Sequence, residues 1–249
     1  MITIKNKEHI AKMRDAGKIV AEVLALMKEH VEPGVSTWEL DEIAENYIRK
    51  CGAVPTFLGY GGFPASICAS INEQVVHGIP NRNCILNEGD IISIDVGATF
   101  LGYVGDAART FPVGKISDEN ARLIEVTRQS FYEGLAHAKK GNRLGDISNA
   151  IQRYVEKNGY SVIRDLVGHG VGENMHEDPM VPNYGKKGRG IKLCEGLTIA
   201  VEPMVAAGHY ALEQLADNWT YVTRDGSMAA HYENTFAITD GEPEILTRL

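Results

Sequence analysis

Residues 35–52 read VSTWELDEIAENYIRKCG, and residues 142–159 read NRLGDISNAIQRYVEKNG. At an offset of 107 residues the two stretches match at a tyrosine, a lysine and the closing glycine, and a glycine precedes each of them, Gly34 and Gly141. Self-similarity at one offset is the mark of an internal duplication. The sequence therefore predicts a fold made of two similar halves.

The same offset extends beyond the helical stretches to acid-bearing strands. LNEG at 86–89 matches LCEG at 193–196, and the following segments IISIDV and TIAVEP place Asp95 opposite Glu202. A second acid precedes a Thr-Phe pair in each half, Asp106 in the first and Glu233 in the second. Chance matching of common residues is the alternative. Agreement of glycines, helices and acids at one offset favours duplication.

Composition indicates an ordinary globular protein. Of the 249 residues, 44% are hydrophobic and 23% charged, and the net charge of −8 opposes general binding to nucleic acid or anionic membrane. The one obvious basic run is Lys186-Lys187-Gly188-Arg189. No stretch has the length of a signal peptide or membrane span, which predicts a cytoplasmic protein. Four cysteines without paired spacing indicate reduced thiols, not a zinc or disulfide framework.

Hydrophobic periodicity predicts helices over 7–30, from Ser36 or Thr37 to Ile48, over 118–139 and over 145–158. Short β segments fill 53–113 and the region after the last helix. With no low-complexity linker, we expect one domain over 1–249, with halves of approximately 1–113 and 114–249 that share one sheet. The fold class is α+β.

Asp95 and Glu202 each lie in a strand with apolar neighbours, where an unpaired carboxylate costs several kcal/mol. A shared cation would neutralise both. A salt bridge is the usual alternative for a buried acid, and Arg109 is available to Asp95.

Three further residues complete a possible metal site. Asp106 or Glu233 alone reads as a solvated residue, but together they can bridge two cations. His169 lies in GHGVG, and one imidazole among acids favours a transition metal over calcium. No GxSxG, HExxH, P-loop or GxGxxG motif is present. The pattern indicates a two-metal hydrolase.

The chain resembles type I methionine aminopeptidases from end to end. The resemblance is carried by SINEQVVHGIP (70–80), EGDIISIDVG (88–97), GYVGDAARTF (102–111), GHGVGENMHEDP (168–179), EGLTIAVEP (195–203) and HYENTFAIT (231–239). Type I is favoured over type II because only 26 positions separate His176 from Glu202, which leaves no room for the helical insertion of type II.

The resemblance implies the pita-bread fold, in which duplicated halves related by a pseudo-twofold axis form an antiparallel sheet with helices on its outer face. It also implies two divalent ions, Fe2+, Mn2+, Co2+ or Zn2+, and allows an additional monovalent cation. By similarity, Asp95 would hold one ion and His169 with Glu202 the other, while Asp106 and Glu233 bridge them. A hydroxide held by both ions would be the nucleophile.

The resemblance further implies the residues that meet substrate. His77 would handle proton traffic, His176 would hydrogen-bond the scissile carbonyl and Glu202 would shuttle a proton. The methionine pocket would be lined by Tyr60, Phe63, Cys68, Met175 and Trp219, and His77 and His176 would also bind the substrate. Two positions depart from the family pattern, because Gly61 replaces a common histidine and Met175 a frequent phenylalanine, which leaves the pocket width open.

The implied function is removal of the initiator methionine from nascent chains whose second residue is small. Implied partners are N-terminal Met-peptides, nascent chains and the ribosome near its exit tunnel, with 186–189 as a candidate contact. Membranes and specific nucleic acids are not expected partners. The protein is expected to be a monomer. Two alternatives stay open: a metal-free peptide-binding protein that kept the scaffold, and cleavage before proline.

Overall fold

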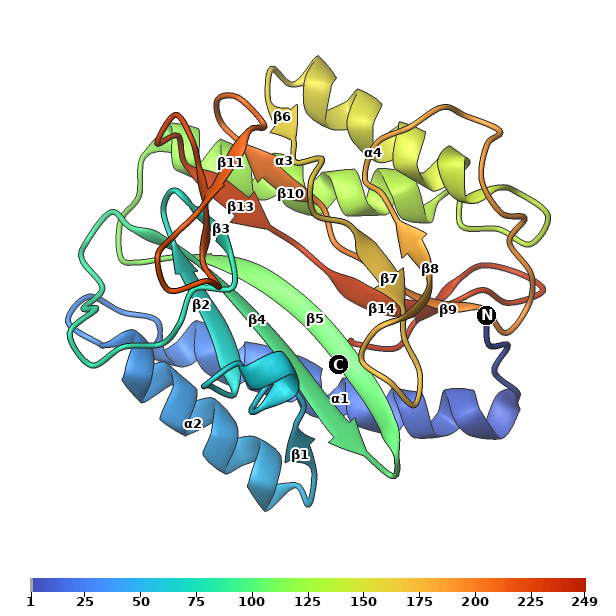
Figure 1. Cartoon of the computed structure of the whole chain (residues 1–249), viewed down its shortest axis with the longest axis horizontal. Helices are drawn as coiled ribbons and strands as arrows, with labels where there is room; N and C mark the ends of the chain where they lie inside the picture. Colours follow the sequence, from blue (N-terminus) through green and yellow to red (C-terminus); the bar gives the residue numbers. More distant parts are fainter. Residues whose placement is uncertain (1) are drawn as a thin grey trace.

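Two pairs of helices enclose the strands of the molecule. The computed structural model describes residues 2–249. In this range the helices are α1 (Lys7–His30), α2 (Thr37–Lys50), α3 (Asp118–Leu135) and α4 (Leu144–Lys157). In Figure 1, α1 and α2 lie along one side and α3 and α4 along the opposite side, with the strands between them. The α+β fold class is confirmed.

Helix boundaries follow from capping residues. Asn6 caps α1 by accepting a hydrogen bond from His9 N at 2.9 Å, and Ser36 forms a reciprocal capping box with Glu39 at the start of α2. The helices expected over 7–30, 36–48 and 145–158 are confirmed, with α2 two residues longer. The expected helix over 118–139 ends at Leu135 instead, because tight i→i+3 bonds such as His137 N to Gly134 O close its last turn.

The strands form four hydrogen-bonded sheets, all of them antiparallel. In the first half, the central strand β4 (Ile91–Phe100) pairs with β1 (Val54–Pro55) and β2 (Ile67–Ile71) on one edge and with β5 (Tyr103–Pro112) on the other. In the second half, the strand order is β15 (Glu244–Ile245), β14 (Asn234–Ala237), β9 (Thr198–Val201), β7 (Gly168–Gly170) and β8 (Glu177–Val181).

Two smaller sheets lie beside these. One has the order β13 (Ala229–His231), β10 (Met204–Ala206) and β6 (Ser161–Val162), and the other β11 (Leu212–Gln214), β12 (Tyr221–Thr223) and β3 (Gln74–Val76). The expectation of one sheet shared by both halves is therefore wrong, because no continuous ladder of backbone hydrogen bonds joins the strands of residues 2–249.

The duplication is visible in equivalent backbone contacts. Gly34 N donates to Leu86 O at 2.8 Å, and Gly141 N donates to Leu193 O at 2.9 Å. Both glycines have positive φ, 94° and 96°, a conformation that other residues rarely adopt. Isolated bridges join 36 to 85 and 143 to 192, again 107 residues apart. The predicted internal repeat is thus present in three dimensions.

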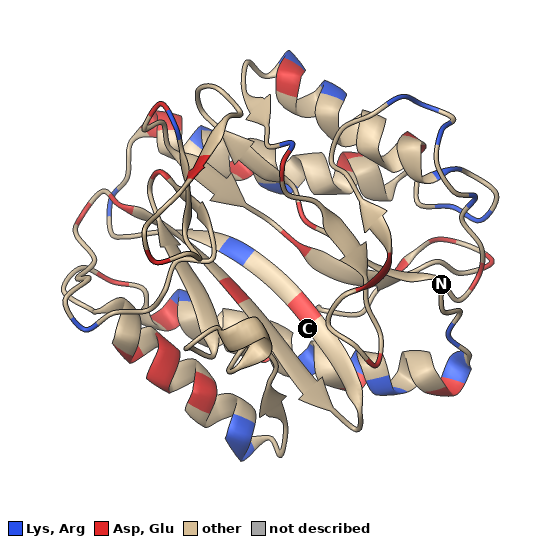
Figure 2. Cartoon of the chain, viewed as in Figure 1, with Lys and Arg blue, Asp and Glu red and all other residues tan. Residues whose placement is uncertain are grey.

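The halves meet where β5 lies beside the segment entering β14 (Figure 1). Glu233 N donates to Ala108 O at 2.9 Å, and Thr235 Oγ1 donates to Asp106 O at 2.9 Å. Each half has its own apolar core, one packed under α1 and α2 and the other under α3 and α4. The seam between these cores carries polar side chains, and Figure 2 shows acidic positions on β4 and β5 in the middle of the molecule.

Candidate metal centre

The β4–β5 hairpin places two acids on one face. Asp106 lies opposite Gly97 in the register, and Asp95 is two residues before Gly97 on the same strand. Alternation along a strand puts residues two apart on the same face. A Cβ at Gly97 would come within 2.7 Å of the Phe57 ring. The glycine thus lets an aromatic side chain pack beside the acids.

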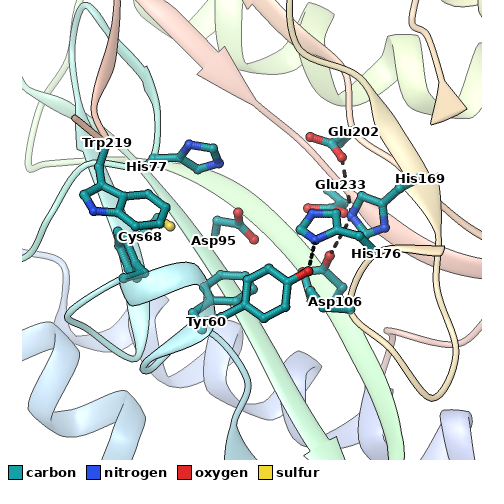
Figure 3. A pocket seen from close by; sticks show the side chains of 13 residues that line it. Tyr60, Cys68, His77, Asp95, Asp106, His169, His176, Glu202, Trp219 and Glu233 are labelled. Atoms are coloured by element: carbon teal, nitrogen blue, oxygen red, sulfur yellow. Dashed lines mark hydrogen bonds and ion pairs between the residues drawn. The ribbon is translucent and has the colours of Figure 1, made fainter. Parts of the chain in front are cut away.

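The second half supplies the remaining three side chains. His169 on β7 pairs with Ala200 on β9, Glu202 directly follows β9, and Glu233 directly precedes β14. Figure 3 shows Asp106, His169, Glu202 and Glu233 gathered together, with Asp95 facing them from β4. All five predicted ligands therefore line one cavity.

The distances between these side chains are those of a compact polar cluster. His169 Nε2 lies 3.4 Å from Asp106 Oδ2 and 3.7 Å from Glu202 Oε1. Donor atoms of Asp106, His169 and Glu233 all lie within 4.8 Å of one another, a spacing that one ion could span after small side-chain adjustments. His169 Nδ1 is 2.8 Å from Gly170 O, which orients Nε2 toward the acids.

Burial makes the acids costly without a cation. Asp106 is 1% exposed and Glu233 2%, and one oxygen of each has no hydrogen-bond partner among the described residues, as has Asp95 Oδ1. Burial, reinforced by the neighbouring carboxylates, raises the pKa of Asp95 and of Glu233 well above the ordinary value. Burial also raises the pKa of Glu202 to about 8.

The alternative salt bridge between Asp95 and Arg109 is not formed. The Arg109 guanidinium instead donates to Ala108 O at 2.8 Å, to Glu233 O and to Asn234 Oδ1, and it stacks 4.1 Å from the Tyr232 ring centroid. No lysine or arginine pairs with the five candidate ligands among the described residues. The acid cluster therefore has no lysine or arginine as a counter-charge, and its oxygens and single imidazole fit a divalent cation of the first transition row.

The protonation of His169 also reflects the negative charge of the cluster. For His169, burial lowers the pKa, but the hydrogen bond with Asp106 and the charge of Glu202 outweigh burial and raise the pKa to about 9. The protonated imidazole thus offsets part of the negative charge of the acids. A bound divalent ion would expel the imidazole proton and favour the ionised carboxylates.

Three more histidines surround the acids. Burial, together with the His169 charge, lowers the pKa of His176 to about 4, and burial also lowers the pKa of His77. Tyr60 Oη is 2.8 Å from His176 Nδ1. His231 is fully enclosed, with Nε2 3.8 Å from Glu233 and 4.0 Å from Glu202, and burial lowers its pKa to about 3.

An apolar pocket opens beside the acids. Phe63 and Trp219 meet edge to face at 5.1 Å between ring centroids, and burial raises the pKa of the Cys68 thiol well above its ordinary value, so the thiol is neutral. A Cβ at Gly61 would lie 3.5 Å from the Trp219 ring, so the residue at 61 borders this aromatic wall. The expected substrate-binding residues are brought together and comprise Tyr60, Phe63, Cys68, His77, Met175, His176 and Trp219.

Two site residues were not singled out from the sequence. Phe57 lines the same cavity, and His231 reaches the acids from the end of β13. His231 stands two residues before Glu233 within HYENTF, so its place in that motif was an available signal. Phe57 lies in a segment without periodicity, and nothing in the sequence distinguished it from core.

The fold and this cluster define a metal-dependent peptidase, and comparison with known proteins gives the family. The model of metallopeptidase family M24 matches residues 11–240. The chain belongs to this family. It is 59% identical over 247 residues to a methionine aminopeptidase of Clostridium acetobutylicum, with 99% of each chain covered, and 53% identical to methionine aminopeptidase 1 of Bacillus subtilis over the full length of both.

Solved structures agree. Methionine aminopeptidase from Thermotoga maritima superimposes with a TM-score of 0.99 at 45% identity, covering all of both chains. An Xaa-Pro dipeptidase from Bacillus anthracis gives a TM-score of 0.78 at 22% identity, and the chain covers 62% of it. That second likeness shows the fold alone. The pita-bread fold is confirmed.

Proposed function

We propose that this protein removes methionine from the N-terminus of polypeptides whose second residue is small. The observation that carries the proposal is one cavity in which the apolar pocket of Phe63, Cys68, Met175 and Trp219 adjoins the buried acid cluster. Such a pocket suits a flexible thioether side chain. Because the acids lie directly beside it, the peptide bond that reaches them is the one after the first residue.

We further propose that the cluster holds two divalent ions. Asp95 would hold one, His169 and Glu202 the other, and Asp106 with Glu233 would bridge them. When bound, such ions lower the pKa of water and stabilise developing negative charge. Support comes from the partnerless buried carboxylate oxygens and from the orienting contact of His169 with Gly170 O. Fe2+, Mn2+, Co2+ and Zn2+ all suit these donors.

The remaining polar groups of the cavity would bind and orient the peptide. If Tyr60 donates its hydroxyl proton to Nδ1, His176 presents Nε2–H as a neutral donor, suited to the carbonyl oxygen of the scissile bond. Glu202 borders the same cavity, and its carboxylate is suited to taking up and returning a proton there. His77 borders the same space and would serve proton traffic at the leaving amide.

The proposed setting is the cytoplasm, with residues 1–249 acting as one catalytic unit on nascent chains. The loop 186–189 is exposed and carries three basic residues, so we propose it as a contact with the ribosome. Among residues 2–249, no helix has the length and hydropathy to cross a membrane. Reversing the three charges should weaken ribosome pelleting without changing peptide turnover. Unchanged pelleting would refute this contact.

The test of the proposed function is release of methionine from Met-Ala-Ser by protein loaded with Fe2+, Mn2+, Co2+ or Zn2+, with metal content measured on the same sample. We expect about two ions per chain and turnover that a chelator abolishes. An Ala-Pro-Ser peptide serves as the control for cleavage before proline. Absence of methionine release under every loading would refute the proposal, and metal-free protein that binds peptide intact would favour the non-catalytic alternative.

A further inference from the structure

The loop between β7 and β8 carries two residues of the proposed substrate pocket. Met175 and His176 both line the cavity, and the loop that presents them runs from 171 to 176 without regular secondary structure. Its first part is tied to β5, because Gly172 O accepts a hydrogen bond from Val104 N at 2.8 Å. Tyr103 Oη also donates to Glu173 Oε1 at 3.0 Å, and Tyr60 Oη lies 2.8 Å from His176 Nδ1.

Glu177 adds a buried, charged support directly after His176. Its Oε1 accepts a hydrogen bond from Asn174 N at 3.2 Å, so the carboxylate spans both Met175 and His176. Its Oε2 forms an ion pair with Lys5 Nζ. The side chains of Lys5 and Glu177 are only 3% and 9% exposed. This is the one ion pair reaching the 171–177 region among the described residues.

Lys5 belongs to the N-terminal arm that precedes α1. The arm is anchored by its backbone, because Lys5 N donates to Gly196 O at 2.8 Å, and Lys5 Nζ also donates to Thr3 O at 3.2 Å. The lysine stem packs directly on the loop, since a Cβ at Gly172 would lie 2.4 Å from Lys5 Cε. A residue 172 positions away from Glu177 in sequence is thus locked against the pocket loop.

A buried ion pair contributes little net stability compared with a well-packed apolar pair, because desolvation offsets the attraction. Its directional hydrogen bonds do, however, define one arrangement of the groups that they join. At an active site this matters, because misplacement by about 1 Å can cost on the order of 100-fold in rate.

We propose that Lys5 is a positioning residue for the reaction: through Glu177 it holds Met175 and His176 in register with the acid cluster, so the N-terminal arm sets the rate of turnover. The inference rests on the proposed aminopeptidase function. Loss of the pair should release the loop and leave the metal ligands in place, because none of the five contacts Lys5 or Glu177 through a hydrogen bond or ion pair in the described chain.

The experiment compares the wild-type chain with Lys5→Met, Lys5→Arg, Glu177→Met and the double variant Lys5→Met/Glu177→Met, all loaded with Mn2+. We expect Lys5→Met to lower kcat/KM for Met-Ala-Ser on the order of 10- to 100-fold. The loss should appear mainly in kcat, because His176 is displaced from the scissile bond. The preference for Met-Ala-Ser over Leu-Ala-Ser should decrease, because Met175 is displaced from the pocket wall. Lys5→Arg should restore most activity, and metal content should be unchanged throughout.

The double variant shows whether Lys5 and Glu177 act together to position the loop or whether their replacements cause two independent defects. If the residues act as one unit, its loss of kcat/KM equals that of either single variant and does not multiply. Arg14→Met is the control for loss of an ion pair away from the pocket, because it removes a more exposed pair of 2.7 Å that joins α1 to Glu244 on β15 and touches no pocket residue. Turnover by Arg14→Met should stay within twofold of wild type, whatever its Tm.

Assays run well below each Tm. Kinetic constants of Lys5→Met within twofold of wild type, or a loss matched by Arg14→Met, would overturn the inference. Should Lys5→Met fail to fold, Glu177→Gln decides the same question, because it keeps an acceptor for Asn174 N and removes only the charge. An active wild type with unaffected variants defeats this inference alone, whereas an inactive wild type defeats the proposed function and this inference with it.

Discussion

At the scale of single residues, the site is dominated by buried acids that no lysine or arginine of the described chain neutralises. Glu233 is 2% exposed, and burial followed by its acidic neighbours raises its pKa well above normal. Its partnerless oxygen is the kind of exception that a bound ion explains. Metal affinity should therefore depend on each carboxylate. Without a bound ion, the same carboxylates should lower the stability of the fold.

Replacing Glu233 by Gln tests this at one residue. Loss of a supporting residue around a metal ligand costs 10- to 100-fold in affinity, so loss of a bridging ligand should cost about 100-fold or more in Mn2+ affinity. Titration calorimetry measures the change. The control is Glu213→Gln, the same chemical change at an exposed position on β11. Unaltered Mn2+ affinity in Glu233→Gln would remove Glu233 from the ligand set.

At the scale of elements, one buried acid joins a helix to a strand. Asp41 on α2 is 4% exposed and accepts hydrogen bonds from Ser66 N at 2.8 Å and Ile67 N at 2.9 Å, at the start of β2. Burial outweighs these bonds and raises the pKa of Asp41 from 3.8 to about 6. Packing of α2 on the sheet therefore depends on pH.

The sign follows from proton linkage. Since the folded pKa lies above the unfolded one, the native state binds more protons between about pH 4 and 6, and stability falls as pH rises through that window. Asp41→Asn keeps a carbonyl acceptor and does not titrate. Its free energy of unfolding relative to wild type should therefore rise by up to about 3 kcal/mol from pH 4 to pH 7. Urea unfolding at both pH values measures this, and a difference independent of pH would contradict it.

At the scale of the whole molecule, the two halves are joined by an apolar cluster to which both contribute and by a seam of polar contacts. Arg109 on β5 reaches across this seam to Glu233 O and Asn234 Oδ1, and Thr110 Oγ1 exchanges hydrogen bonds with the backbone of His231. Three of the five candidate ligands come from the second half. Alignment of the halves thus decides whether the ligands meet.

Arg109→Met should weaken this alignment. Two buried acceptors lose this donor at about 1–3 kcal/mol each, so we expect a loss of about 2–6 kcal/mol in unfolding free energy, together with weaker Mn2+ binding through displacement of Glu233. Arg109→Lys should restore only part of the unfolding free energy and of the Mn2+ affinity, because one ammonium group cannot make the several directed hydrogen bonds of the planar guanidinium. Urea unfolding and calorimetry report the two effects. Full metal affinity in a destabilised Arg109→Met would show that Glu233 does not need this contact.

Removal of the metal should lower the stability of the entire fold. An ion bound only by the native state stabilises it by about 2.7 kcal/mol at a free concentration 100 times Kd. Tm should therefore rise with added Mn2+ and fall on chelation, as measured by calorimetry. Glu233→Gln should respond far less at the same concentration. An equal rise in both proteins would point to ion binding elsewhere.

The sequence by itself determined the duplication, most helix limits, the strands that carry the acids and the five candidate ligands. These features depend on local periodicity, on capping residues and on an offset repeated along the chain, so they can be read without knowing the contacts. The segments around Asp95 and Glu202 could be matched because each acid follows a glycine-closed helix at the same distance in the sequence.

Tertiary structure alone decided the rest. It separated the strands into distinct sheets and directed Arg109 to backbone carbonyls and not to Asp95. It also placed Phe57 in the cavity wall, His231 beside the acids and the Lys5–Glu177 pair against the loop that carries Met175 and His176. Each of these contacts joins residues far apart in the chain, and no local pattern encodes such a pairing. Packing of the two halves decides which side chains meet, and burial then sets the protonation of those that titrate.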